Sequence, residues 1–299
     1  MKFRILILDI YPKVNYRISK DLNGGYGTAN DYGDSWFSQL LKLYVKDTIS
    51  FPPLYSVQVC GELIALGHEV DFKNNSQKVN YENYDLILIP SSIVCHETEI
   101  EVIKTLSNYK KLLAIGPFAS VSPENYLKNG AAVLKGEPEN FFHNINLNEF
   151  INNFKIEIIE NNKIIPLDDL SIPGWEIIFR ENIPVMKFLG KGPAINLYAS
   201  KGCPYTCFYY CVYPMQQGRK LRLKNPKKVV EEMIYFYNKL NVNNYIFRDP
   251  VFSIDKKHTI LLCQEILKSG IKFNIAVETH LKNIDNELAD LFLKCGVKL

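Results

Sequence analysis

The sequence lacks the features that mark several large classes of protein. No apolar run approaches the roughly 20 residues of a membrane-spanning helix, so neither a membrane segment nor a membrane partner is expected. The formal charge of +3 over 299 residues is small and the lysines are scattered, which argues against a nucleic-acid partner. The apolar run at residues 5–10 is interrupted by Asp9, so it predicts a first strand and not a signal peptide.

Cysteines are few, and their number is odd. Seven cysteines, three of them clustered, do not suit a disulfide framework and favour a reducing compartment, so we expect a cytoplasmic protein. The four outside the cluster are predicted to be small buried apolar groups: Cys60, Cys95, Cys263 and Cys295. With 47% hydrophobic and 22% charged residues, the chain has the composition of a globular protein and is long enough for two domains.

The clustered cysteines lie within nine residues of one another. Cys203, Cys207 and Cys211 belong to the stretch GCPYTCFYYC. Thiolates are the preferred ligands of soft metals and of iron–sulfur clusters. Three thiolates leave one iron of a four-iron cluster without a protein ligand, so that this iron can bind a small molecule. A structural zinc site is the alternative, but zinc takes a fourth ligand and no histidine lies in the stretch.

Strands and helices alternate in the first part of the chain, which predicts a Rossmann-like (flavodoxin-like) parallel sheet. Strands are predicted at residues 3–10, 69–72, 85–90, 112–115 and 132–134, with helices at 53–66, 97–106 and 123–128. Ligands of such sheets bind beyond the carboxyl ends of the strands. The loops there are either ordinary turns or an approach for a large flat ligand; they contain Gly24, Gly25, Ser91, Ser92, Gly116, Gly136 and Glu137.

A less regular stretch, residues 146–192, is predicted to link two domains. Residues 154–165 alternate around two asparagines, a pattern typical of a β-hairpin. Residues 170–175 contain a proline-punctuated linker. The first domain then covers residues 1–145 and the second residues 193–299.

A second alternating series predicts part of a (β/α) barrel. Its strands are expected at residues 195–199, 245–247 and 272–277, with a fourth opening at 297–299. Asn225 caps a helix that runs to Leu240, and two further helices are expected at 255–269 and 286–294. Six βα units of about 30 residues each need roughly twice the length of chain that lies after Ile195, so we expect half a barrel, as a fragment or completed by a downstream polypeptide.

These stretches together resemble the cobalamin (B12)-binding radical S-adenosylmethionine (radical SAM) family, over nearly the whole chain. The resemblance to its cysteine loop, following helix and second strand is carried by ASKGCPYTCFYYC, GRKLRLKNPKKVVEEM and FRDPVFSID. The resemblance to its cobalamin-binding module is carried by PPLYSVQVCGELIALGHEV, YDLILIPSS, AIGPFASVSPENYLKNG and KGEPE, and the linker motif IPGW also fits.

The resemblance implies an enzyme with a [4Fe–4S] cluster on Cys203, Cys207 and Cys211 and S-adenosylmethionine on the open iron. Reduction by an external electron donor would split the cosubstrate to a 5′-deoxyadenosyl radical, which attacks a small-molecule or otherwise unknown substrate. Bound cobalamin commonly adds methyl transfer. Tyr210, with Tyr209 as a competitor, resembles the aromatic residue that packs on the adenine.

The carboxylates at the strand ends of the second series are further candidates. Asp249 and Glu278 stand where they can bind the amino group or ribose of the cosubstrate. Solvated loop carboxylates with no ligand are the alternative.

The chain departs from the family pattern in two places. Three residues separate Cys207 from Cys211 where two are usual, and one extra residue shifts a thiol by up to about 3.5 Å. Asp9 is followed by Tyr11 where histidine-ligating cobalamin modules carry Asp-x-His-x-x-Gly, so no axial histidine is expected from this motif. Two alternatives therefore stay open: a degenerate, non-catalytic paralogue that binds at most cobalamin, and a binding module held together by a metal or cluster.

Overall fold

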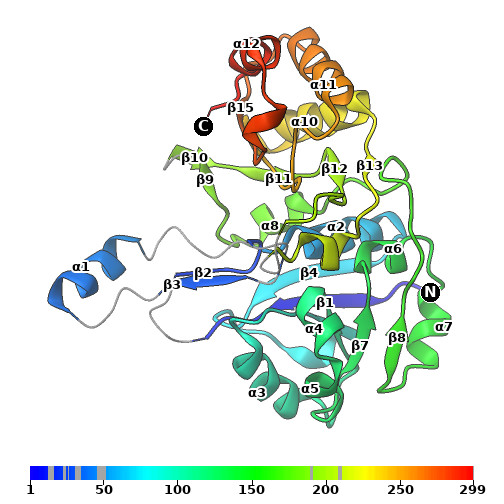
Figure 1. Cartoon of the computed structure of the whole chain (residues 1–299). Coiled ribbons are helices and arrows are strands. Elements are labelled where there is room, and N and C mark those ends of the chain that lie inside the picture. Colours follow the sequence, from blue (N-terminus) through cyan, green and yellow to red (C-terminus); the bar gives the residue numbers. More distant parts are fainter. Residues whose placement is uncertain are drawn as a thin grey trace. The chain divides into compact units, whose positions relative to one another are not determined.

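The structure is a computed structural model, and it shows two compact units. One unit comprises Met1–Ile165 with Leu170–Pro184, and the other comprises Pro166–Asp169 with Val185–Leu299 (Figure 1). The described residues are 1–12, 17–22, 25, 27–30, 35–45, 52–188, 191–207 and 211–298. Among these residues, no helix is both long and apolar enough to cross a membrane.

The first unit is built on a six-stranded sheet in which every neighbouring pair is parallel. Its strand order is β4-β1-β5-β6-β7-β8. Since both faces of a parallel sheet are covered, its strands are near-continuous apolar runs, and all residues of β5 are buried. The bounds are β1 (Arg4–Asp9), β4 (Glu69–Asn74), β5 (Leu86–Pro90), β6 (Leu112–Ile115), β7 (Ala132–Lys135) and β8 (Ile158–Glu160).

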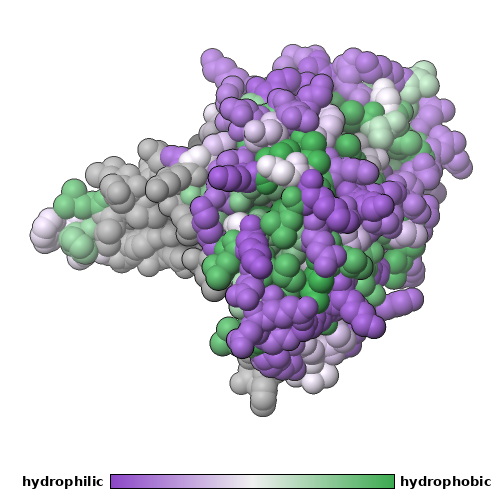
Figure 2. All heavy atoms as spheres, turned by 90° about the horizontal axis from the view of Figure 1, so that it is seen from above, coloured by the Kyte–Doolittle hydropathy of each residue, from purple (hydrophilic) through white to green (hydrophobic). Residues whose placement is uncertain are grey.

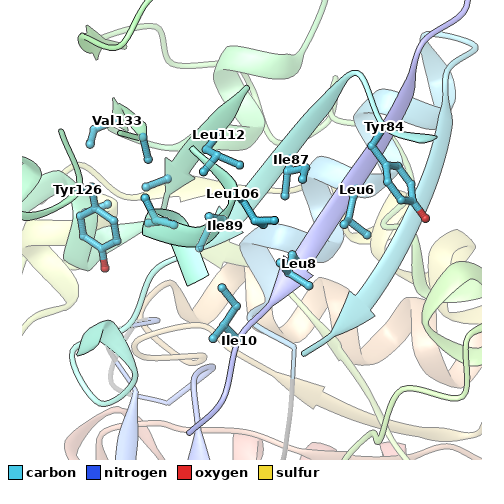
Figure 3. Close-up of a cluster of buried hydrophobic side chains, with 14 residues drawn as sticks. Leu6, Leu8, Ile10, Tyr84, Ile87, Ile89, Leu106, Leu112, Tyr126 and Val133 are labelled. Carbon is cyan, nitrogen blue, oxygen red and sulfur yellow. The ribbon is translucent and has the colours of Figure 1, made fainter. Parts of the chain in front are cut away.

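Helices cover this sheet. Figure 3 shows the core cluster in which Leu6, Leu8, Ile87 and Ile89 of the strands lie with Leu106 of a helix. An antiparallel pair, β2 (Arg17–Ser19) with β3 (Thr28–Asn30), follows the first strand. The other elements of the unit are α1 (Trp36–Val45), α2 (Leu54–Ala65), η3 (Tyr81–Asn83), α3 (His96–Leu106), α4 (Pro117–Val121), α5 (Pro123–Leu127), α6 (Pro138–Phe142), α7 (Leu147–Asn152) and α8 (Trp175–Arg180).

Helix α1 exposes apolar side chains. Trp36 is 76% exposed, Phe37 59% and Leu40 52%, and the apolar atoms at the left edge of Figure 2 come from this helix. On the coloured part of the face in view, hydrophilic residues predominate, and apolar residues lie between them.

The hairpin expected at residues 154–165 is wrong. Instead, β8 extends the sheet, pairing in parallel with β7. The pairing continues to Asn161, whose backbone N–H donates to the carbonyl of Lys135 at 3.0 Å. An alternating pattern is shared by hairpins and by half-buried edge strands, so the periodicity alone does not distinguish them.

Residues 170–175, expected as a linker, belong to the first unit and pack on helix α2. A Cβ atom on Gly61 would lie 2.1 Å from the carbonyl oxygen of Ile172, so only glycine fits this approach. The N–H of Gly174 donates to the carbonyl of Val57 at 2.8 Å. Trp175, which starts α8, is 2% exposed. The chain therefore passes through Pro166–Asp169 of the second unit and returns to the first.

The second unit contains a three-stranded parallel sheet in the order β11-β14-β15. Val297 forms an isolated parallel bridge with Ile275, where a fourth strand was expected. The strands are β11 (Ile195–Leu197), β14 (Asn244–Phe247) and β15 (Asn274–Ala276), and two antiparallel pairs join β9 (Lys187–Phe188) with β10 (Lys191–Pro193) and β12 (Ser200–Lys201) with β13 (Arg222–Leu223). The helices are α9 (Tyr213–Gln217), α10 (Pro226–Leu240), α11 (Lys256–Lys268), η4 (Leu281–Asn283) and α12 (Asn286–Cys295).

Side-chain caps fix where the long helices of this unit begin. The Asn225 side chain accepts a hydrogen bond from the N–H of Lys227, and Pro226 occupies the first turn, as predicted. Asp255 caps α11 and Asp285 caps α12 in the same way. The strand–helix alternation of both units confirms the predicted α/β fold class.

Candidate functional site

The cysteine loop follows the first strand of the second unit's sheet on a fixed stretch of backbone. The N–H of Gly202 donates to Oε1 of Gln217 at 3.1 Å, and the N–H of Cys203 donates to the carbonyl of Gly218 at 3.1 Å. Gly202 has a φ of +89°, and a Cβ atom there would lie 2.1 Å from the carbonyl oxygen of Lys220. The residue before Cys203 must therefore be glycine, and the backbone hydrogen bonds fix the position of Cys203.

The three thiols differ in their contact with water. Cys203 is buried, Cys211 is partly exposed and Cys207 is exposed. Burial raises the pKa of Cys203, and the charges of Cys211 and Cys207 raise it further. Tyr209 and Tyr210 lie outside the described residues.

The thiols do not surround a single ion. Among the residues that the structure describes, no group of three or more His, Cys, Asp or Glu side chains is arranged to hold one metal ion. In a [4Fe–4S] cluster each thiolate binds a different iron, which spaces the sulfurs more widely. The donor set of three cysteines fits such a cluster, and these ligands stay a prediction.

Asp249, just after β14, is buried, and both of its carboxylate oxygens accept hydrogen bonds from neighbouring residues of the protein. Its Oδ1 accepts a hydrogen bond from the N–H of Ala199 at 2.9 Å, and its Oδ2 accepts one from Oγ of Ser200 at 2.6 Å. Burial raises the pKa of this carboxyl to about 7, against the opposing effect of these hydrogen bonds. Asp249 therefore fixes the residues that lead into the cysteine loop, and its predicted contact with the cosubstrate stays a prediction.

Glu278, just beyond β15, is half in water. Its side chain is 49% exposed and lies 3.5 Å from Nη1 of Arg248. The hydroxyl of Tyr213 donates to it at 3.3 Å. A half-exposed carboxylate can exchange such partners for a cationic group of a ligand, because screened pairs of this kind are weak. Its role in binding the cosubstrate also stays a prediction.

A buried ionic network lies at the carboxyl edge of the first unit's sheet, and the sequence analysis missed it. Nζ of Lys20 lies 3.0 Å from Oδ1 of Asp9 and 2.9 Å from Oε1 of Glu99, and it donates to the carbonyl of Pro90 at 3.0 Å. The three charged side chains are at most 1% exposed. Burial raises the pKa of both carboxyls, and the charge of Lys20 opposes this effect. We name this triad the Lys20 network.

Two tyrosines extend the Lys20 network. The hydroxyl of Tyr126 donates to Oε2 of Glu99 at 2.7 Å, and that of Tyr11 donates to Oδ2 of Asp9 at 2.8 Å. Tyr11 occupies the place where a ligating histidine stands in Asp-x-His-x-x-Gly. In this chain the hydroxyl of Tyr11 instead donates to the carboxylate of Asp9, two residues earlier.

The two serines predicted to bind a cobalamin-like ligand are buried, and their hydroxyl oxygens accept hydrogen bonds from the protein's own backbone. Ser91 and Ser92 are fully buried. Oγ of Ser91 accepts a hydrogen bond from the N–H of Ala119 at 2.9 Å, and Oγ of Ser92 accepts one from the N–H of Val94 at 3.3 Å. These hydroxyls shape the loops after the strands.

The predicted glycines keep backbone segments close together. Gly25 and Gly116 have φ values of +89° and +100°, and a Cβ atom on Gly116 would lie 2.3 Å from the hydroxyl oxygen of Tyr55. Gly136 is exposed with a φ of +102°, and the adjacent Glu137 is partly exposed. Gly24 lies outside the described residues. All these ligand assignments stay predictions.

Sequence comparison finds relatives that are named as methyltransferases and as cyclases. No family model matches the chain. It is 26% identical over 280 residues to an uncharacterized methyltransferase of Synechocystis, covering 87% of this chain and 48% of that protein. It is 24% identical over 287 residues to an anaerobic magnesium-protoporphyrin IX monomethyl ester cyclase of Cereibacter sphaeroides, covering 83% of this chain and 46% of that protein. The chain thus spans about half the length of these curated relatives.

Solved structures share the fold of the chain. TsrM of Kitasatospora setae, a radical SAM methyltransferase solved with cobalamin and a [4Fe–4S] cluster, superposes with a TM-score of 0.60 at 14% identity, over 100% of this chain and 60% of TsrM. The chain has the fold of the cobalamin-dependent radical SAM enzymes. OxsB, another such enzyme, solved with aqua-cobalamin and S-adenosylmethionine, gives a TM-score of 0.64 at 12% identity, over 99% of this chain and 43% of OxsB. The radical SAM resemblance predicted from the sequence is confirmed.

Proposed function

We propose that this chain contributes the cobalamin-binding unit and the cluster-binding part of the barrel to a radical SAM enzyme. The observation that carries the proposal is the position of Cys203, Cys207 and Cys211, directly after the first strand of a parallel βα sheet in a chain with this fold. Because the chain spans about half of its curated relatives, the activity is proposed for the whole protein.

The three thiolates would hold a [4Fe–4S] cluster, which when bound supplies the electron that splits S-adenosylmethionine into methionine and a 5′-deoxyadenosyl radical. The chain's own residues would position the cysteine loop and orient the cosubstrate. Asp249 fixes Ala199 and Ser200 ahead of the loop. Glu278, which is half in water and at the same strand-end edge, is available to the cosubstrate's ammonium group.

The first unit would bind cobalamin along the carboxyl edge of its sheet. Support comes from the exposed backbone at Gly136, and from the two solved structures that contain cobalamin. The polar side chains of that edge already bond to one another, so backbone groups and shape would hold the cofactor. We propose methyl transfer as the reaction, because the Synechocystis relative and TsrM are both named as methyltransferases, and TsrM has been solved with tryptophan as substrate.

Anaerobic reconstitution with iron and sulfide tests this function. The wild-type chain is expected to take up on the order of four iron and four sulfide ions, as a four-iron cluster requires, and then to form 5′-deoxyadenosine from S-adenosylmethionine under reduction. Cys207→Ala is expected to abolish both. Cys95→Ala is the matched control, because Cys95 is buried in the first unit and outside the loop. A wild-type chain without iron, or full iron uptake by Cys207→Ala, contradicts the proposal.

The extra residue between Cys207 and Cys211 favours a second candidate, a non-catalytic protein that binds cobalamin alone. In that case the wild-type chain binds hydroxocobalamin but no cluster. Deletion of Tyr210, which restores the usual spacing, would then recover iron uptake.

A further inference from the structure

Tyr205, between the first two loop cysteines, is held by the segment that follows β15. Its hydroxyl lies 3.1 Å from both Oδ1 and Nδ2 of Asn283, donating to the first atom and accepting from the second. Nζ of Lys282 lies 4.2 Å from the centroid of the Tyr205 ring, within the range of a cation–π interaction. The ring of His280 contacts the same ring edge-on at 5.9 Å.

A second cation holds the backbone of the same residue. Nη1 of Arg219 donates to the carbonyl oxygen of Tyr205 at 3.2 Å. We name Tyr205, Arg219, Lys282 and Asn283 the Tyr205 clasp.

Holding this part of the loop has a thermodynamic consequence. A loop that presents three thiolates to one inorganic core must lose conformational freedom when the core binds. Interactions that already order the loop reduce this loss and so increase affinity. Gly202 and Gln217 fix the loop before Cys203, and the Tyr205 clasp fixes the segment between Cys203 and Cys207.

We propose that Tyr205 is a positioning residue for the iron–sulfur cluster. The Tyr205 clasp orders the part of the loop between Cys203 and Cys207. The inference rests on the proposed function, because it needs a cluster on the three cysteines. The two cations of the clasp lie beside a loop that carries several thiolates when loaded, and positive charge there favours the more negative, reduced cluster.

Cluster release from the full chain tests the clasp. Anaerobically reconstituted wild type, Tyr205→Phe and Tyr205→Leu are mixed with an iron chelator, and the loss of absorbance near 400 nm is followed. Because Tyr205→Leu removes both the hydrogen bonds and the ring beneath Lys282, release is expected to be about five- to tenfold faster. Tyr205→Phe keeps the ring but loses the hydroxyl, so its release rate should lie between those of wild type and Tyr205→Leu. Tyr237→Phe on α10 is the matched control and should release iron at the wild-type rate.

Two further measurements separate positioning from general stability. Circular dichroism and melting of the iron-free variants should match wild type. The electron paramagnetic resonance spectrum of the reduced cluster should change in Tyr205→Leu, and Lys282→Gln should lower the reduction potential. Wild-type release rates and spectra in Tyr205→Leu would overturn the inference while leaving the proposed function intact. A wild-type chain that takes up no cluster would overturn both.

Discussion

The carboxyl edges of the two sheets use charged groups in opposite ways. In the first unit, Lys20, Asp9 and Glu99 are at most 1% exposed and bind one another. In the second unit, the Glu278 carboxylate is 49% exposed and Cys207 is exposed. Both edges end parallel strands, where ligands of α/β proteins bind.

The difference separates a buried, internally bonded edge from an edge with exposed groups. A buried network whose members already bond to one another holds loops in place, but it contacts a ligand only if those bonds break. Exposed or half-exposed groups need no such rearrangement. We therefore expect changes in the Lys20 network to alter stability first, and changes at the second edge to alter chemistry with smaller effects on folding.

Lys20→Met should give the largest effect. The substitution leaves Asp9 and Glu99 buried without their cation, and breaking a buried ion pair in this way costs about 3–5 kcal/mol. Urea unfolding at pH 7 measures the loss. Lys135→Met is the control, because Lys135 and Glu160 are 34% and 57% exposed and such surface pairs contribute about 0–1 kcal/mol. Equal losses in both variants would break the comparison.

Asp249→Asn tests a buried carboxylate of the second edge. The amide keeps one acceptor but presents N–H groups where the carboxylate accepts from Ser200, so unfolding should become easier by about 1–3 kcal/mol. Ser200→Ala, which removes a single partner, should cost about 1 kcal/mol in the same urea assay. If Asp249→Asn is as stable as wild type, the carboxylate does not fix the loop.

The pH dependence of stability sharpens the same point. The pKa of Asp249 is raised from its ordinary value of 3.8 to about 7, so between these values the folded state binds more protons than the unfolded state. Stability from this group therefore falls as pH rises from about 4 to about 7. The wild-type unfolding free energy should decline more across this range than that of Asp249→Asn. Parallel pH profiles would show that the carboxyl titrates normally.

Glu278→Gln should give the smallest change in stability. Since the carboxylate is half in water, loss of its pair with Arg248 should cost less than about 1 kcal/mol. Binding of S-adenosylmethionine to the reconstituted chain, followed by calorimetry, should weaken measurably. A large loss of stability without weaker binding would place Glu278 with the structural groups and remove the contrast between the two edges.

Local patterns predicted the features that depend on local physics. The apolar runs at residues 3–10, 85–90 and 112–115 each became a strand, and Asn225 caps the helix expected after it. The spacing of the three cysteines indicated a cluster loop, and it follows the first strand of a parallel sheet, where the pattern placed it.

Contacts between distant residues could not be predicted. Lys20 and Glu99 are 79 residues apart, and Tyr205 and Asn283 are 78 apart. No periodicity connects such pairs, because the fold alone brings them together. The expected hairpin failed for a related reason: β8 pairs with β7, not with a neighbour across the two asparagines.

The path of the chain between its two units limits how the protein can be divided. Pro166–Asp169 belongs to the second unit, although both flanking segments belong to the first. In the second unit, Oδ1 of Asp168 accepts a hydrogen bond from the N–H of Asn225 at 2.6 Å, and its carbonyl accepts one from Nζ of Lys228 at 2.6 Å. A gene split after Pro184 would strip these partners from α10, and a split after Ile165 would deprive the first unit of α8. No single division point in the gene would therefore yield both units complete.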